Sequence, residues 1–124
     1  MISYIKPVKE TDYMNSQEFN EIVKQTERLV EKTLIKKQDE YNLDEDRLSF
    51  FKHNAQFLGK TPEEALWAMA SKHFISLTDM INSKQAFAEE TFDEKIVDAI
   101  NYLILLKGLV LDTGKAIKKK EDLK

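Results

Sequence analysis

The chain has 124 residues, of which 42% are hydrophobic and 33% are charged, and its formal net charge is -3. These values predict one folded domain over residues 1–124 and argue against a nucleic-acid-binding protein. Without any cysteine, disulfides and thiolate catalysis are excluded. The apolar runs are too short to span a membrane, and residues 1–10 lack the apolar segment of a signal peptide, so we expect a soluble, cytoplasmic protein.

The first part of the chain predicts an arm followed by a long helix. Residues 1–14 have no regular hydrophobic period and predict an extended N-terminal arm. Asn15 or Ser16 then caps a helix that runs to about Asp39. Its apolar stripe recurs at helical spacing and consists of Phe19, Ile22, Val23, Leu29, Val30 and Leu34. In the acidic link that follows, Asp44, Glu45 and Asp46 could either bind a hard cation or favour the positive start of the next helix.

Three more helices follow in the sequence. The second is predicted over residues 47–58, closed by Gly59, and the third begins at Thr61-Pro62-Glu63-Glu64, a capping box with proline at the first helical position. The last runs from Thr91 to Gly114 and is apolar on all sides, so we expect it to form the centre of the core. Thr91 and Glu94 suggest a second capping box, and residues 115–124 predict a flexible basic tail.

These elements predict an all-α domain, a four-helix bundle-like fold with an extended N-terminal arm. The apolar perimeter of the last helix is wider than three short partners can cover. We therefore also expect a homo-oligomer, most simply a dimer that buries the excess.

The polar residues of the last two helices are the candidates for chemistry. If these helices pack antiparallel, Asp79 and Glu94 lie near the same end of the bundle and Asp98 lies deeper, with Asn101 one turn further on. Facing carboxylates can bind Mg²⁺ as hard oxygen ligands, and the cation can hold a polyphosphate for attack by water. This arrangement predicts a magnesium-dependent phosphate site.

Two lysines and a histidine flank these acids: Lys72, His73 and Lys95. The lysines could complement phosphate charge. A structural alternative is also open, in which Lys72 pairs with Asp98, or Asp79 with Lys95, and the pair fixes the register of the two helices. His73 is likewise either a core residue with one satisfied nitrogen or a catalytic group.

Three segments carry a resemblance to a known family: EYNLDEDRLSFFKHNA, TPEEALWAMASKHFISLTDM and EKIVDAINYLILLKGLV. They resemble small all-helical proteins of tailed phages and prophages, which are distantly similar to the MazG-like all-α nucleoside triphosphate pyrophosphohydrolases. The similarity covers about residues 37–111. It implies hydrolysis of a (d)NTP to the (d)NMP and pyrophosphate with Mg²⁺, in the cytoplasm of a bacterial host, by a protein that is usually a dimer or tetramer.

The resemblance also implies roles for individual residues. Asp98 and Glu94 would be catalytic, and the metal would be held by Asp79, Glu94, Asp98 and Asn101. The nucleotide would be bound by Lys72, Lys95, His73 and Asn101. The enzymes place E-x-x-E on one helix and E-x-x-D on the next, whereas here Asp98 replaces the glutamate and Asn101 the aspartate of the second motif. The alternative function is a non-catalytic phage protein that binds a host protein or sequesters a signalling nucleotide.

Overall fold

The structure is a computed structural model that describes residues 13–41 and 46–123. Its helices are α1 (Ser16–Tyr41), α2 (Ser49–Leu58), α3 (Pro62–Asn82) and α4 (Glu89–Asp112), followed by a short 3₁₀ helix, η1 (Lys120–Asp122). The described residues form no strand, and the predicted all-α fold is confirmed. Most of the predicted arm, and the acids Asp44 and Glu45, lie outside the described residues. No helix within them has the length and apolar character needed to cross a membrane.

Side chains that close the first turn fix the starts of α1 and α3. The carboxamide oxygen of Asn15 accepts a hydrogen bond from the backbone N–H of Glu18 at 2.8 Å, and the Glu18 carboxylate accepts one from the backbone N–H of Asn15. At α3, the pair Thr61 and Glu64 makes the same reciprocal bonds, with Pro62 at the first helical position. The bond from the Thr61 N–H lowers the pKa of the Glu64 carboxyl. Both predicted starts are confirmed.

The start of α4 differs from the prediction. The helix begins at Glu89, after Ala88, which makes no side-chain cap. The backbone N–H of Thr91 already donates to the carbonyl of Ala88 at 3.0 Å, so Thr91 lies inside the first turn. The predicted capping box of Thr91 and Glu94 is therefore wrong, because both residues belong to the helix body.

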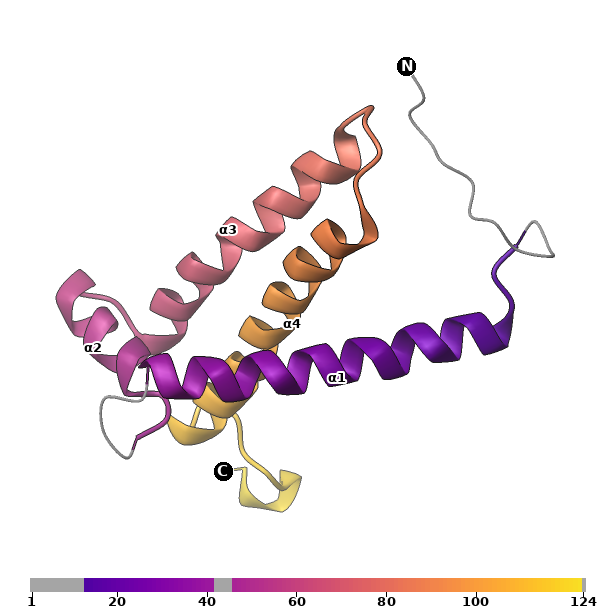
Figure 1. Cartoon of the computed structure of the whole chain (residues 1–124). Helices are drawn as coiled ribbons and strands as arrows, with labels where there is room; N and C mark the ends of the chain where they lie inside the picture. Colours follow the sequence, from indigo (N-terminus) through magenta and orange to yellow (C-terminus); the bar gives the residue numbers. More distant parts are fainter. Residues whose placement is uncertain (1–12, 42–45, 124) are drawn as a thin grey trace.

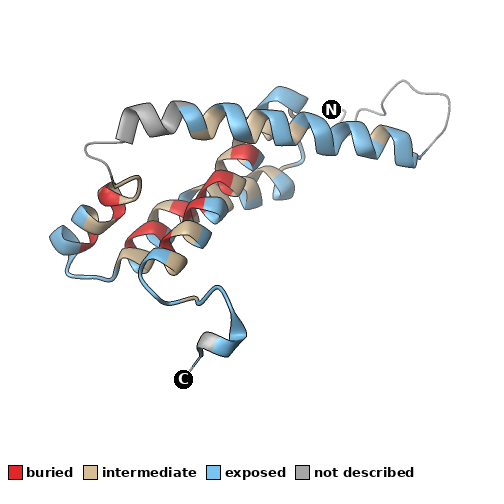
Figure 2. Ribbon diagram, turned by 90° about the horizontal axis from the view of Figure 1, so that it is seen from below, coloured by how far each residue is buried: buried red, intermediate tan, exposed pale blue. Residues whose placement is uncertain are grey.

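The core lies where α2 and α3 pack on α4. In Figure 1, α3 and α4 run side by side in opposite directions, α2 lies at one end of this pair, and α1 crosses α4. The buried core cluster is Phe51, Leu66, Ala70, Tyr102, Leu105 and Leu109. Figure 2 shows that buried residues follow the length of α4. The last helix is thus the centre of the core, as the sequence predicts.

Helix α1 is the most exposed of the four. Apart from the side chains of 36–41, which are not described, none of its residues is buried (Figure 2). Three members of the predicted stripe, Phe19, Ile22 and Val23, are 57%, 42% and 41% exposed, whereas Leu29, Val30 and Leu34 are partly covered. The helix contacts α4 from its middle towards its C-terminal end, and its first turns extend past α4 (Figure 1). The first three residues of the predicted stripe are therefore open to solvent rather than part of the core.

Candidate functional site

The acidic residues of α4 gather in a pocket between α1 and α4, which we call the α1–α4 pocket. Its volume is about 320 Å³, and it is lined by Gln25, Leu29 and Thr33 of α1 and by Glu90, Asp93, Glu94, Val97 and Asp98 of α4. Glu90, Glu94 and Asp98 follow one another at intervals of four residues and Asp93 follows Glu90 by three, which places the acids on one side of the helix. The crossing of α1 over α4 therefore places four carboxylic acids beside the apolar Leu29 and Val97.

A fully buried amide lies next to this pocket. Asn101 follows Asp98 by three residues, and its Nδ2 donates a hydrogen bond to the hydroxyl of Thr33 at 2.7 Å. That hydroxyl in turn donates to the backbone carbonyl of Leu29 at 2.8 Å. The Oδ1 of Asn101 has no hydrogen-bond partner among the described residues. A buried oxygen without a donor costs about 1–3 kcal/mol, so this atom destabilises the core of the described residues.

Asp98 also reaches a residue of α3. Its Oδ2 lies 3.7 Å from Nδ1 of His73, and both side chains are about three-quarters buried. The ring of His73 packs against that of Tyr102, with 5.0 Å between the ring centroids. One carboxylate thus lines the α1–α4 pocket and also contacts the α3–α4 seam. His73 lies beside this carboxylate on the α3 side.

The predicted site residues are only partly brought together. Glu94 and Asp98 line the pocket and Asn101 adjoins it, whereas Asp79 is exposed on α3 and does not line it. Neither do the two lysines, Lys72 and Lys95. Because His73 faces α4, the helical rotation turns Lys72 and Asp79 away by roughly 100° and 120°. No three His, Asp or Glu side chains among the described residues lie close enough to share one metal ion.

The lysine–aspartate pair that was the structural alternative at the seam of α3 and α4 does not form in the described part of the chain. Neither Lys72–Asp98 nor Asp79–Lys95 occurs among the ion pairs of the described residues, and His73 is the group beside Asp98. Asn101 does have a structural contact, but its partner is Thr33 on α1 and not a residue of α3. At this place in the seam between α3 and α4, an imidazole lies beside the Asp98 carboxylate where a lysine was expected.

Several lining residues were missed by the sequence reasoning: Gln25, Thr33, Glu90 and Asp93. Thr33 could have been found, because it is a hydroxyl set within the apolar stripe of α1. Glu90 was assigned to the loop before α4, since the helix start was placed at Thr91.

Comparison of the chain with protein-family models, with curated proteins and with solved structures found no match.

Proposed function

We propose that the protein binds a nucleoside triphosphate together with Mg²⁺ at the α1–α4 pocket and hydrolyses it to the monophosphate and pyrophosphate. One observation carries this proposal: Glu90, Asp93, Glu94 and Asp98 line a single pocket between two helices. The activity is the one that the MazG-like resemblance implies. The location differs from the expected one, because antiparallel packing of the last two helices was expected to set the acids of α4 against α3 rather than α1.

The donor set suits magnesium bound together with a phosphate. Mg²⁺ commonly takes one or two carboxylates from the protein and fills its remaining positions with substrate phosphates and water. Glu94 and Asp98, one helical turn apart, are the pair we assign to the ion, and Asp98 is the catalytic residue. When bound, Mg²⁺ would supply neutralising charge to the phosphate oxygens. A complete ring of protein ligands is not needed for this mode of binding.

Of the residues that were predicted to bind the nucleotide, only those close to Glu94 and Asp98 remain in the proposed site. Asn101 adjoins the pocket through its hydrogen bond to Thr33, and Nδ1 of His73 lies 3.7 Å from the Asp98 carboxylate on the α3 side. Lys72, Lys95 and Asp79 lie outside the pocket lining, so we omit them from the proposed site.

Pyrophosphate release from a panel of canonical and modified (d)NTPs, with Mg²⁺ and with Mn²⁺, tests the proposal. Asp98→Asn should lower the rate about 100-fold, as expected when a transition-state charge contact is lost. Asp79→Asn is the matched control, since it makes the same change on α3 outside the pocket, and it should leave the rate unchanged. Equal rates in Asp98→Asn and the unmutated protein, or no release from any substrate, would show that the proposed reaction is wrong.

A second candidate function is favoured by the exposed apolar residues of α1. It is a non-catalytic protein that binds a host protein or sequesters a signalling nucleotide. In that case Asp98→Asn changes only stability or ligand affinity. A nucleotide that raises the melting temperature without any release of pyrophosphate would favour this function, because a ligand of the native state alone must stabilise it.

A further inference from the structure

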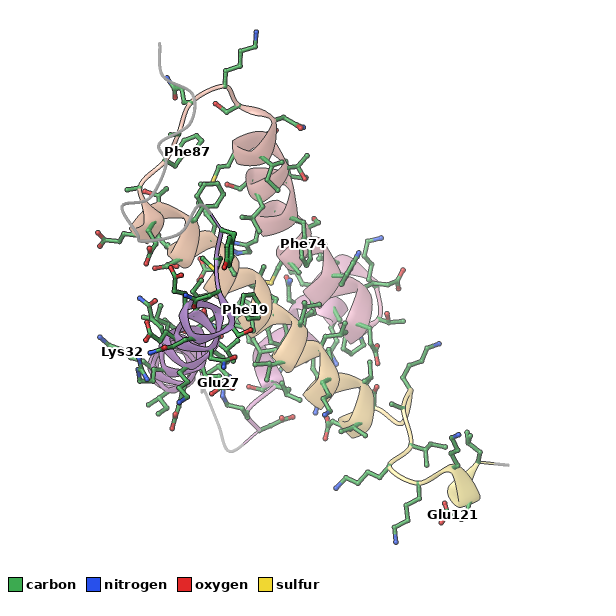
Figure 3. All side chains as sticks on the ribbon, turned by 90° about the vertical axis from the view of Figure 1, so that its right-hand side faces the viewer. Phe19, Glu27, Lys32, Phe74, Phe87 and Glu121 are labelled. Atoms are coloured by element: carbon green, nitrogen blue, oxygen red, sulfur yellow. The ribbon has the colours of Figure 1, made fainter. Side chains whose placement is uncertain are left out.

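The two ends of the α1–α4 pocket carry different groups. In Figure 3, which looks almost along α1, this helix lies nearer to α4 than to α3, and both walls of the pocket come from these two neighbours. The two helices run in the same general direction where they cross (Figure 1). Thr33 and Asp98 line one end, beside the hydrogen bond that joins Asn101 to Thr33. Gln25 and Glu90 come two helical turns earlier, about 12 Å along each helix, and line the other end.

The end that holds Gln25 has a hydrogen-bond acceptor on one helix and an amide on the other. Glu94 and Asp98 are assigned to Mg²⁺, so Asp93 and Glu90 keep their carboxylates for another contact. Asp93 is partly buried, whereas Glu90 is exposed. The carboxamide of Gln25 forms no hydrogen bond within the described residues, so its Nε2 and Oε1 are both available to a ligand. Asp93 and Gln25 are therefore the pair that can recognise a ligand at this end.

The edges of the nucleobases fall into two classes that a carboxylate can distinguish. Cytosine and adenine have an amino group, which donates, next to a ring nitrogen that accepts. Uracil, thymine and guanine have at the corresponding position a carbonyl oxygen, which accepts, next to a ring N–H. A carboxylate accepts hydrogen bonds and does not donate them, so it pairs with the amino group and is repelled by the carbonyl oxygen. An amide nitrogen beside it completes the match, because it donates to the ring nitrogen.

We propose that Asp93 and Gln25 determine base specificity at the α1–α4 pocket, and that the substrate is a nucleotide of cytosine or adenine. Asp93 accepts a hydrogen bond from the amino group, and Nε2 of Gln25 donates one to the neighbouring ring nitrogen. Leu29 and Val97 also line the pocket and give the base and the sugar an apolar surface. This inference rests on the proposed function, because it takes the phosphates to lie with Mg²⁺ at the Asp98 end.

A comparison of dCTP with dUTP tests the proposal, because the two bases differ only in the amino group or carbonyl oxygen and the ring nitrogen next to it. The value of kcat/KM, from pyrophosphate release, should be roughly 10- to 100-fold higher for dCTP, as expected for one hydrogen bond to a charged group. Asp93→Asn should bring this ratio close to one, since a carboxamide also donates to a carbonyl oxygen. Asp79→Asn is the matched control and should keep the ratio. Asp98→Asn should lower both values and keep the ratio as well.

Gln25 offers a second variant, which leaves α4 unchanged. Gln25→Glu replaces the Nε2 donor by an acceptor and should also lower the ratio, because an acceptor suits the ring N–H of uracil. This variant serves where Asp93→Asn loses its helical circular dichroism, since Gln25 is exposed on α1.

Rates and melting temperatures together separate this inference from the proposed function. Release of pyrophosphate from dCTP and dUTP at equal rates, or a ratio that the folded variants leave unchanged, would overturn the base recognition while the reaction stands. A melting temperature raised more by dCTP with Mg²⁺ than by dUTP with Mg²⁺, without release, would keep the base recognition and overturn the reaction. No release and no difference in melting temperature would overturn both.

Discussion

Asn101 and Thr33 join two helices through residues 68 positions apart in the chain. The amide is wholly buried, and its Nδ2 depends on the Thr33 hydroxyl as its acceptor. Its Oδ1 lacks a hydrogen-bond donor among the described residues, and a buried polar atom without a partner lowers the free energy of unfolding. The pair is therefore sensitive to changes that an all-apolar contact would tolerate.

Thr33→Val should lower the free energy of unfolding by about 1–3 kcal/mol, because it leaves a buried N–H without an acceptor. The double variant Thr33→Val with Asn101→Leu should recover most of that loss, since both polar partners are replaced by apolar groups of similar shape. Urea denaturation measures both. Thr26→Val is the control, because the Thr26 hydroxyl bonds only within its own helix, to the carbonyl of Ile22. A double variant no more stable than the single one would contradict this account.

At the scale of the helices, the two threonines that sequence reasoning treated alike have different positions. Thr61 precedes α3 and makes both bonds of a capping box, whereas Thr91 lies within the first turn of α4. Thr61→Ala should therefore cost about 1 kcal/mol of unfolding free energy, and Thr91→Ala should have almost no effect. Thermal melts of the two variants, compared under the same conditions, check this. Equal losses at the two positions would mean that the cap of α3 contributes nothing specific.

Local signals were sufficient for the helices and insufficient for the site. Four helices were predicted from the spacing of apolar residues and from signals at helix ends, namely the caps Asn15 and Thr61 and the stop Gly59. These signals act within one or two helical turns, so the sequence alone reveals them. The polar side of α4 is covered by α1, which crosses it. This contact joins distant parts of the chain, so no local sequence signal predicts it. The sequence reasoning assigned that side to α3 and so missed Gln25 and Thr33.

At the scale of the whole molecule, Lys52 links the segment before α2 to the end of α4. Its Nζ lies 2.5 Å from carboxylate oxygens of both Asp46 and Asp112. The hydrogen bond from Lys52 lowers the pKa of Asp46 below its ordinary value of 3.8. Hydrogen bonds to Asp112 and then to Asp46 raise the pKa of Lys52 above its ordinary 10.5. The charged forms of both groups are therefore favoured by folding.

These shifts predict how stability depends on pH. The Asp46 contribution is complete above pH 3.8 and is lost as the pH falls through the lowered pKa. The Lys52 contribution is complete below pH 10.5 and is lost as the pH rises through the raised pKa. Lys52→Met should thus lower the melting temperature slightly at neutral pH, since the side chains are partly exposed, and the difference should shrink at both extremes. Lys84→Met, in the exposed loop before α4, is the control; a difference that does not vary with pH would contradict the assignment.

The order of the helices has a consequence during synthesis. Helix α1 leaves the ribosome first, but α4, on which it packs, comes last of the four. At about 5–20 residues per second, the 68 positions between Thr33 and Asn101 take roughly 3–14 s to translate. Throughout that interval the whole stripe of α1 is a nascent hydrophobic segment without its own partner. A chaperone, or the α1 of a neighbouring nascent chain, can bind it before the bundle closes.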